Sequence, residues 1–546
     1  MKISFYFLLF FWAGQLAAQE RGARMPYTRY PSDSGRVNAG KVLRSPEATG
    51  QRYVSLEAAG AFIEWPVRAT AQGIDIRFTL PDNATGTGLN GVLALYVNGR
   101  KVQDVALSSY WAYQYCRTGV SDPYQTPQEK TFMAFDEVHF RLGVSLKPGD
   151  MIRLEKDGGD SISYGIDFIE LEPLPAVVAA PAGSVSVTSY GAVPDDGQDD
   201  LEAFNAALRA AAAGGKTVYI PPGRYLLSDK WMVRESGVRV EGAGIWYTQL
   251  YFSTNRQDYG GIVVRANGVE MAGFSVNTAN NARLQYAEEG ARMAGSKYKQ
   301  YKGFLGGFGT GSSIHDVWVE HFEAGFWIGG GGGAASAEAS AGESAGEVGE
   351  TDRLKIVNCR IRNNYADGVN FNQGTSRSVV ENCSIRNNGD DGMAVWPNGG
   401  MNVKGPCVED SFRNNTIEDN WRAAGAAIFG GWGHEIANNL FIGGVGGSGI
   451  RMTNDFPGWG FYMDREVITV VNNLIVGSGT TADIWDNPKG AIEIDASKGI
   501  YHVQFIRNEV DRSQWEPVRV VGKLAKVEFH GTKEDGRVVE VSVDER

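Results

Sequence analysis

A short phrase built on asparagine recurs through the second half of this chain at a nearly regular interval. It stands at Asn358 and Asn382, which are 24 residues apart, and it returns at Asn414, Asn438 and Asn472 after 32, 24 and 34 residues. The short apolar runs around each copy show no helical period. Repeats of about 20 to 50 residues with β character predict a solenoid in which each repeat forms one turn. The asparagines are then expected to stack at a turn and to bond the backbone there.

Three aspartates lie in the two most regular copies of this repeat. Asp367 and Asp391 are also 24 residues apart, so a solenoid stacks their carboxylates on successive turns, and Asp390 is one residue out of register. Like charges this close repel, so at least one pKa in the cluster is expected to rise. From the residues alone, acid–base catalysis is supported about as well as the alternative, in which the acids bind calcium or only end turns.

The solenoid is expected to span residues 185–546. Near its start, residues 201–213 have acids before them and glycines after them, a pattern that predicts one capped helix. A strand, a turn and a second strand are expected over 217–227. Residues 329–350 are rich in Gly, Ala, Ser and Glu and predict a loop, for which an insertion without function is the favoured interpretation.

The first third of the chain divides into four segments of different composition. Residues 1–18 combine an early lysine with an apolar run and small residues, as a secretory signal peptide does. Residues 19–50 are polar and turn-rich and predict a leader. Residues 51–174 carry short alternating runs separated by turn signals, which predict a β-sandwich. Residues 175–184 are small and include prolines, as in a linker.

The overall charge narrows the class of partner. The 546 residues have a formal net charge of −12, which argues against binding of nucleic acid or another polyanion. After the first segment no apolar run is long enough to span a membrane, and no cysteine follows that segment where a lipid anchor would attach. We therefore expect a secreted or periplasmic protein without a membrane span, and a monomer.

Two of the four cysteines follow the repeat. Cys359 and Cys383 are 24 residues apart and are expected to stack. Turns about 4.8 Å apart permit a disulfide between them, and two buried thiols are an equally supported alternative. Cys116 and Cys407 add no constraint.

Two stretches of the chain resemble known families. The segment from Tyr190-Gly-Ala to Val218-Tyr-Ile-Pro-Pro-Gly-Arg-Tyr resembles the start of the pectate-lyase-like right-handed β-helices, in which the helix caps the solenoid. The phrase from Asn364 to Trp396, with its Asp-Gly and Asp-Asp-Gly, resembles glycoside hydrolase family 87, the α-1,3-glucanases and mycodextranases. The expected fold is all-β, a right-handed parallel β-helix preceded by a galactose-binding-like β-sandwich.

The same region is similar to the wider polygalacturonase-like clan but departs from its pectin-cleaving pattern. Gly433-His434-Glu435 and Arg451-Met452-Thr453 stand where that clan has Gly-His-Gly and Arg-Ile-Lys. Thr453 replaces the lysine that pairs with the galacturonate carboxylate in those enzymes. The loss of this cation, together with the negative net charge, predicts a neutral glycan, and the resemblance implies an α-glucan.

The three acids are sufficient for glycoside hydrolysis, which needs one acid at the leaving oxygen and one carboxylate to activate water. We expect the stacked Asp367 and Asp391 to hold the water and the offset Asp390 to donate the proton, since successive side chains of an extended strand diverge. The resemblance implies the same roles and an inverting outcome, and it favours catalysis over the alternative. No cofactor is expected to be required.

Several residues near the acids are candidates for substrate binding. The histidine can bond a sugar hydroxyl or orient Asp390, and a structural histidine is about equally supported. The arginine can bond a sugar hydroxyl or neutralise the acid cluster, and a surface ion pair is the simpler alternative. Aromatic rings stack on sugars, and their concentration here predicts that some of them line a cleft. The expected set is His434, Arg451, Trp396, Trp432, Asn370, Asp455 and Trp459.

The sandwich resembles carbohydrate-binding modules of families 35 and 6 through Leu56-Glu57, Gly60-Ala-Phe-Ile-Glu-Trp and Ile166-Asp167-Phe-Ile-Glu-Leu. An early Glu and a late Asp can hold a structural calcium ion in those modules, which implies Glu57 and Asp167 here. Whether this domain binds sugar stays open.

The leading prediction is a secreted endo-α-1,3-glucanase acting on a mutan- or nigeran-type substrate. The alternatives are a dextranase-, galactosidase- or polygalacturonase-like glycosidase, a glycan-binding or adhesion protein without catalysis, and a polysaccharide lyase. Thr453 argues against the lyase, because a lyase typically needs a basic residue for a uronic acid substrate.

Overall fold

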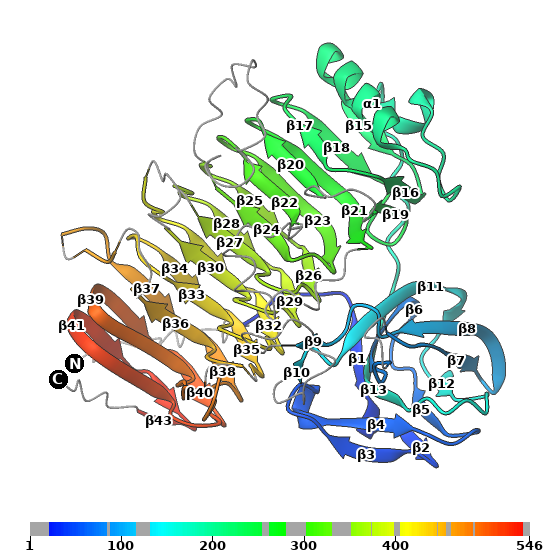
Figure 1. The fold of residues 1–546 in the computed structure, drawn as a ribbon, viewed down its shortest axis with the longest axis horizontal. Helices are drawn as coiled ribbons and strands as arrows, with labels where there is room; N and C mark the ends of the chain where they lie inside the picture. The colour runs from blue at the N-terminus through cyan, green and yellow to red at the C-terminus, as the bar shows by residue number, and fades with distance from the viewer. Residues whose placement is uncertain are drawn as a thin grey trace, which may run out of the picture.

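The structure is a computed structural model that describes residues 21–83, 88–115, 131–253, 261–279, 302–329, 351–372, 374–397, 405–444, 446–454, 460–462, 464–483 and 486–538. The expected signal peptide and almost all of the 329–350 loop lie outside these residues. Figure 1 shows a long solenoid, coloured from green to red, with a blue and cyan β-domain against its side. No helix in the described part of the chain is long and apolar enough to cross a membrane.

The N-terminal domain consists of two antiparallel sheets that enclose their own hydrophobic core, as the sequence predicts. The first sheet contains β1 (Thr28–Pro31), β3 (Lys41–Arg44), β4 (Arg52–Leu56), β6 (Ala71–Thr79), β11 (Asp136–Leu146) and β13 (Tyr164–Glu172). The second contains β2 (Arg36–Asn38), β5 (Phe62–Pro66), β7 (Asn90–Val97), β8 (Arg100–Ser108) and β12 (Met151–Glu155). A separate short pair is formed by β9 (Gln114–Tyr115) and β10 (Thr131–Phe132).

The predicted leader, residues 19–50, contributes three strands to this sandwich, so the boundary expected at residue 51 is wrong. β1 pairs with β13, β2 with β5 and β3 with β4. The β3 strand is exposed along its whole length, and β2 is mostly exposed. Edge strands with so little burial need few apolar side chains, and their sequence therefore looks like a polar segment.

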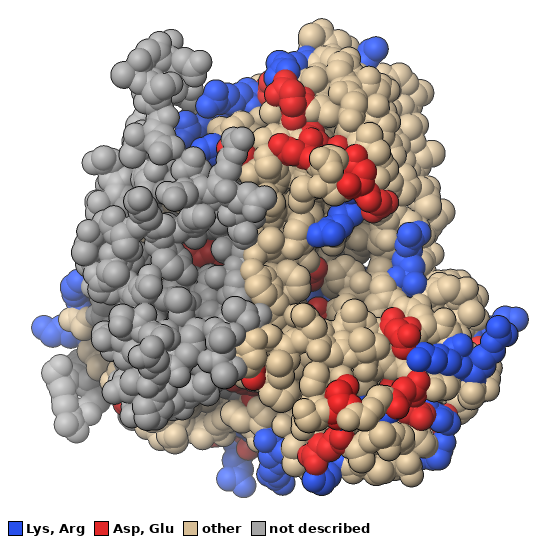
Figure 2. All heavy atoms as spheres, turned by 45° about the vertical axis from the view of Figure 1, so that its right-hand side comes forward, with Lys and Arg blue, Asp and Glu red and all other residues tan. Residues whose placement is uncertain are grey.

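On the face shown in Figure 2, the acidic and basic side chains of the described residues are interspersed over this domain.

The solenoid has three rows of parallel strands, here called rows 1, 2 and 3 in the order in which the chain visits them. Row 1 contains β14 (Val185–Ser186), β15 (Thr217–Ile220), β18 (Arg239–Gly242), β21 (Glu270–Thr278), β23 (Ser313–Glu320), β25 (Lys355–Val357), β28 (Val379–Glu381), β31 (Ser411–Arg413), β34 (Glu435–Ala437) and β37 (Ile468–Val471). Row 2 contains β16 (Gly223–Leu227), β19 (Thr248–Phe252), β26 (Arg360–Arg362), β29 (Ser384–Arg386), β32 (Thr416–Glu418), β35 (Leu440–Ile442), β38 (Leu474–Val476), β40 (Glu509–Asp511) and β42 (Lys533–Glu534).

Row 3 contains β17 (Trp231–Val233), β20 (Ile262–Arg265), β22 (Lys302–Gly307), β24 (Ala324–Ile328), β27 (Val369–Asn372), β30 (Met393–Trp396), β33 (Ala426–Ile428) and β36 (Ile450–Thr453). The strands β21 and β23 extend from row 1 into row 2, where they lie between β19 and β26. The long strands β39 (Ile492–Ile506) and β41 (Val518–His530) likewise extend over rows 3 and 1, and β43 (Arg537–Val538) pairs antiparallel with β42. Apolar side chains from all three rows fill one continuous core. The predicted parallel β-helix is confirmed.

The predicted helix covers the first turn of the solenoid as α1 (Leu201–Gly214), seen at the upper right of Figure 1. Its buried face includes Phe204 and Leu208, which join the solenoid core. Of the two acids before the helix, only Asp199 caps it, because its carboxylate accepts a hydrogen bond from the Leu201 amide (3.2 Å). The carboxylate of Asp200 instead accepts one from the Val193 amide (2.8 Å). The acids before the helix thus bond both the helix and the segment that leads to it.

The repeated asparagines hold successive turns together, as predicted. Asn358, Asn382, Asn414, Asn438 and Asn472 all have left-handed backbone, with φ between 53° and 56°, which asparagine tolerates better than most residues. The next position in each turn is buried. There, the side-chain amide of each asparagine donates to the side-chain oxygen of the asparagine one turn on, along Asn415, Asn439, Asn473 and Asn508 (3.1, 3.0 and 2.9 Å).

Cys359 and Cys383 occupy the same column as these buried asparagines. The Cys383 amide donates to the side-chain oxygen of Asn415 (2.9 Å), and the Cys359 amide points at the sulfur of Cys383 (3.4 Å). Both thiols are free and buried, as is Cys407, whereas Cys116 lies outside the described residues. Of the two alternatives, the structure therefore contains two buried thiols and not a disulfide between Cys359 and Cys383.

The sandwich packs on row 2 through a buried network of charges. Arg362 of β26 and Arg386 of β29 are fully buried and meet carboxylates of the first sheet. Arg386 pairs with Glu137 (2.6 Å) and Glu170 (2.9 Å), and Arg362 pairs with Glu137 (2.9 Å). Buried charges of this kind are tolerated when they are paired, and an unpaired one is costly. The network therefore makes each domain depend on the other.

The sandwich also contacts the corner that joins row 2 to row 3. Asn387 donates to the backbone oxygen of Phe135 (2.8 Å), and the Tyr365 hydroxyl donates to the backbone oxygen of Trp111 (2.7 Å). Asp367, Asp390 and Asp391 follow these residues in the same corner. The sandwich thus supports the turns that carry the three acids.

We expect Arg386→Met to lower the free energy of unfolding by about 3–5 kcal/mol, because it leaves Glu137 and Glu170 buried without this cation. Denaturant unfolding followed by circular dichroism measures the change. The control is Arg512→Met, which removes an exposed ion pair with Asp511. An unfolding midpoint equal for both variants would contradict the structural role of the network.

Candidate active site

The three acids lie together at the corner between rows 2 and 3, and the predicted stacking is present. Val369 pairs with Met393, and the Gly368 amide donates to the Asp391 carbonyl oxygen (2.9 Å), so Asp367 and Asp391 occupy the same position on adjacent turns. The Asp391 amide donates to Oδ1 of Asp367 (3.2 Å). Both side chains are buried, each with 4% of its surface exposed.

Burial changes the acidity of this stacked pair. It raises the pKa of Asp391 to about 7, and the negative charge of Asp367 acts in the same direction. Burial also raises the pKa of Asp367 to about 6, against hydrogen bonds from the Asp391 amide and from Asn370 (3.3 Å). The expected rise of at least one pKa in the cluster is confirmed, and the stacked pair titrates near neutral pH.

Asp390 differs from the pair in exposure and in partner. Its side chain is 37% exposed, and it forms an ion pair with Arg422, whose side chain is almost completely buried. The amide of Asn420 donates to the Asp390 backbone oxygen. The predicted offset is therefore present, but sequence reasoning missed Arg422, which approaches from the next turn of the solenoid.

A buried ion pair between Lys302 and Glu323 adjoins the acids on the other side, and it was also missed. Lys302 is paired with Ala324 in the sheet, and the Gly325 amide donates to the Asp367 carbonyl oxygen (3.0 Å). Lys302, Ala324, Asp367 and Asp391 therefore take the same position on four successive turns. The positive charge of Lys302 lowers the pKa of Asp367, in opposition to burial. The segments that separate Lys302, Ala324 and Asp367 differ in length, so the 24-residue repeat in the sequence did not reveal this register.

The predicted substrate-binding residues have different environments. Asn370 is buried and donates to Asp367, so it positions a carboxylate. Trp396 ends β30, half-buried, with its ring edge-to-face against Trp327 at 5.8 Å. Trp432 lies beyond the end of β33, away from the acid-bearing ends of the row 3 strands, and packs edge-to-face with Tyr462 at 5.7 Å.

His434 does not face a substrate, and the prediction that it binds one is wrong. Its side chain is fully buried, and Nδ1 accepts a hydrogen bond from the Asp410 amide (3.1 Å). Burial lowers the pKa of His434 to about 4, so the ring is neutral near pH 7. Arg451 is partly exposed, and its charge lowers the pKa of Asp391. Asp455 and Trp459 lie outside the described residues.

The two carboxylates expected to hold calcium have cationic partners within the protein. Glu57 pairs with Lys41 (2.5 Å), and Asp167 pairs with buried Arg77. The described residues contain no group of three or more His, Cys, Asp or Glu side chains arranged to hold a metal ion. These contacts favour a structural role for both carboxylates in ion pairs.

Family models for α-1,3-glucanase catalytic domains D1 and D2 match residues 24–174 and 200–460. The chain belongs to glycoside hydrolase family 87. The catalytic domain of Agl-KA is 40% identical and superposes with a TM-score of 0.85, covering 95% of this chain and 89% of that one. The catalytic unit of the family 87 α-1,3-glucanase from Streptomyces thermodiastaticus strain HF3-3 has a TM-score of 0.75 at 24% identity, covering 95% and 92%.

The expected family, the α-1,3-glucanase activity and the glycoside hydrolase class are confirmed by these matches. Residues 24–174 match a catalytic domain, although their sequence resembles a carbohydrate-binding module. Among curated proteins, a mannuronan C5-epimerase of Azotobacter vinelandii (AlgE2) is 38% identical over 100 residues, which are 17% of this chain. The chain spans about a tenth of the length of that relative.

Asp391→Asn is expected to stabilise the protein at pH 8 but not at pH 4. A carboxyl whose folded pKa is about 7 and whose ordinary value is 3.8 favours folding when protonated and costs stability as pH rises through this window. The amide carries no charge, so the gain at pH 8 should be on the order of 2–4 kcal/mol. Denaturant unfolding at the two pH values measures it.

The control for this prediction is Asp390→Asn, one residue earlier. Asp390 is more exposed and is paired with Arg422, so its replacement should give no gain at pH 8. An equal gain from Asp391→Asn at both pH values would show that burial of its charge is not the cause.

Proposed function

We propose that this α-1,3-glucanase is an exported, endo-acting enzyme that inverts the anomeric carbon and needs no cofactor. The observation that carries the mechanism is the corner of three acids, two of them stacked and buried and the third offset and partly exposed. Glycoside hydrolysis needs one group that activates water and another that protonates the leaving oxygen. This corner supplies both groups, a buried carboxylate pair that can activate water and a partly exposed acid that can protonate the leaving oxygen.

Structures of other family 87 α-1,3-glucanase catalytic domains support this assignment of residues. They contain nigerose or tetrasaccharides, which are glucan ligands of those proteins. Some of them are alanine variants of single aspartates, and the substituted positions are separated by 23 residues and by one. Asp367, Asp390 and Asp391 have the same separations.

In the proposed mechanism, Asp367 and Asp391 hold the attacking water between them. Their raised pKa values make the ionised pair a stronger base than ordinary carboxylates, and a base poised near the working pH is the most effective. Asn370 and the Ala424 amide (2.9 Å to Oδ1 of Asp391) fix the two carboxylates.

Asp390 donates the proton to the leaving oxygen. Its exposure allows it to reach a glycosidic oxygen, and its pairing with Arg422 separates it from the stacked acids that hold the water. Arg422 forms an ion pair with Asp390 in the structure, so proton donation to the substrate requires this contact to open. Trp396 supplies an aromatic surface on row 3 for a sugar ring.

Incubation with insoluble α-1,3-glucan, nigeran, dextran and polygalacturonate, followed by measurement of reducing ends, tests the substrate and the acid together. We expect cleavage of the α-1,3-linked substrates into fragments of mixed length, with β-anomers released first as seen by NMR. Asp390→Asn should lower kcat by about 10²–10⁴-fold. Cleavage of polygalacturonate alone would exclude the neutral-glucan assignment.

The control for the acid is Asp104→Asn, an exposed aspartate on β8 of the sandwich that pairs with Lys101. This variant should retain wild-type kcat. If Asp390→Asn retained it as well, the role of Asp390 as proton donor would be excluded.

Lys302→Met should shift the acidic side of the pH profile of kcat/KM toward higher pH. The charged groups around Asp367 are Lys302, Glu323 and Asp391, and loss of the lysine removes the cation that lowers the pKa of Asp367. The pair then ionises only at higher pH. Lys302→Arg keeps the charge and should keep the wild-type profile. A lower kcat with an unmoved profile would show that Lys302 has only a structural role.

A further inference from the structure

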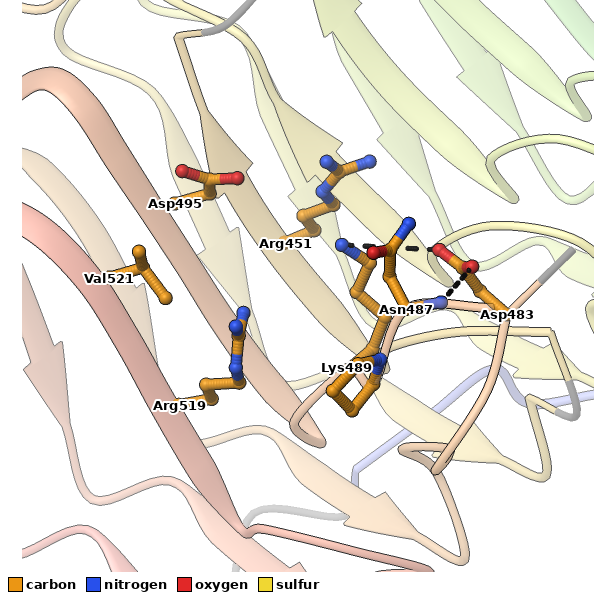
Figure 3. Close-up of a pocket in the computed structure, with 8 residues that line it drawn as sticks. Arg451, Asp483, Asn487, Lys489, Asp495, Arg519 and Val521 are labelled. Atoms are coloured by element: carbon orange, nitrogen blue, oxygen red, sulfur yellow. Dashed lines mark hydrogen bonds and ion pairs between the residues drawn. The ribbon is translucent and has the colours of Figure 1, made fainter. Parts of the chain in front are cut away.

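A polar cavity lies on the outer side of row 3, toward the C-terminal end of the solenoid. Its volume is about 320 Å³. It is bounded by β36, β39 and β41 on one side and by Asp483 and residues 487–489 on the other. Its polar lining is Arg451, Asp483, Asn487, Lys489, Asp495 and Arg519. Figure 3 shows Arg451, Asp495 and Arg519 rising from these three strands across from Asp483 and Lys489.

The strand register relates this cavity to the acids. Asn370, Ala394, Ala427, Arg451, Glu493 and Arg519 take one position on successive turns of row 3. At about 4.8 Å per turn, Arg451 is roughly 10 Å and Arg519 roughly 19 Å along the solenoid from the turn of Asp391. The two positions between Asn370 and Arg451 are held by Ala394 and Ala427, both buried. A polysaccharide that is cut at the acids and extends toward the C-terminal end of the solenoid has sugars beyond the cleaved bond at the distance of the cavity.

Arg451 is the cavity residue with a buried hydrogen-bond donor that has no acceptor among the described residues. Lys489 lies near Asp483 (4.0 Å) and Glu493 (3.9 Å), and Arg519 forms an ion pair with Glu493. In the described part of the chain Arg451 makes no hydrogen bond or ion pair, and its Nε is buried without an acceptor. A buried donor without a partner is costly, which indicates that a ligand or water completes it.

The charges of the cavity favour a neutral ligand. Three cations, Arg451, Lys489 and Arg519, are balanced by the carboxylates of Asp483, Glu493 and Asp495. An anionic ligand would gain from the cations but would lie against the carboxylates. A sugar hydroxyl accepts a hydrogen bond from a guanidinium and donates one to a carboxylate, so a polyhydroxyl ring satisfies both kinds of group.

We propose that this cavity is a distal glucosyl-binding site, which holds a sugar of the same α-glucan chain away from the cleaved bond and thereby favours the cleavage of long chains over short ones. The proposal rests on the proposed function. Arg451 donates to the sugar, Asp495 on β39 accepts from it, and the Lys489–Asp483 and Arg519–Glu493 pairs form the walls.

The test fills the cavity from a surface position and leaves Arg451 in place, because the charge of Arg451 acts on Asp391. Val521 lines the cavity and is 38% exposed, so Val521→Trp places a ring in the cavity without disturbing the core. The matched control is Val538→Trp, at a more exposed valine on β43 outside the cavity lining. Asp495→Ala is a second variant, which removes a proposed acceptor without adding bulk.

The enzyme is assayed on α-1,3-linked oligosaccharides of increasing length, and the measured quantity is the ratio of kcat/KM on long chains to that on short chains. We expect Val521→Trp to lower this ratio by about tenfold, equivalent to about 1.4 kcal/mol of binding, and Asp495→Ala to lower it in the same direction. Val538→Trp should keep the wild-type ratio. An unchanged ratio in both cavity variants, in an enzyme that does cleave α-1,3-glucan, overturns the distal site and leaves the proposed function intact.

Binding measured by calorimetry in an Asp390→Asn background separates the cavity from catalysis. Adding Val521→Trp should weaken the binding of a long α-1,3-linked oligosaccharide and leave inorganic phosphate without measurable binding in either protein. Phosphate binding that is lost with Val521→Trp would show an anion site instead of a sugar site. If the wild-type protein cleaved none of the α-1,3-linked substrates, the proposed function itself would be wrong.

Discussion

The geometry of this enzyme depends on the register that asparagine side chains impose between turns of the solenoid. An asparagine with left-handed backbone turns the chain, and at Asn415, Asn439 and Asn473 the following buried asparagine bonds the backbone and side chain of its neighbours. Because equivalent positions of successive turns lie above one another, a residue type that recurs with the repeat forms a column of side chains along the solenoid axis. The stacked carboxylates of Asp367 and Asp391 are one such column, and the buried Cys359 and Cys383 belong to another.

A column of buried acids is electrostatically unfavourable, and the surrounding residues offset this in part. Lys302 acts on Asp367 and Arg451 acts on Asp391, while Arg422 pairs with Asp390. The pKa values of the stacked pair nevertheless stay raised, to about 6 and about 7, because burial outweighs these neighbours. The sandwich holds the same corner from outside through Asn387 and Tyr365. Its match to a catalytic domain agrees with this support, since the buried arginines of row 2 need its carboxylates.

Features with short sequence periods could be predicted, and features formed between distant segments could not. The repeat predicted the solenoid, the stacking of Asp367 on Asp391 and the offset of Asp390. It did not reveal Lys302, which precedes Asp367 by two irregular turns, or Arg422, whose turn has a different length from the one before it. His434 was misjudged because a motif position does not report burial, and in the structure its ring lies inside the solenoid. The first three strands of the sandwich were taken for a leader because exposed edges carry polar residues.

The sequence by itself determined the class of fold and the stacking of Asp367 on Asp391, because a repeat with fixed spacing leaves a parallel solenoid little freedom in what it stacks. The family was indicated by the resemblance of the motifs around these acids. Only the tertiary structure decided the environment of those acids. Burial, the cations beside each carboxylate and the contact with the sandwich come from segments tens to hundreds of residues away. Charge interactions depend on distance and on exclusion of water, and neither is written in the local sequence.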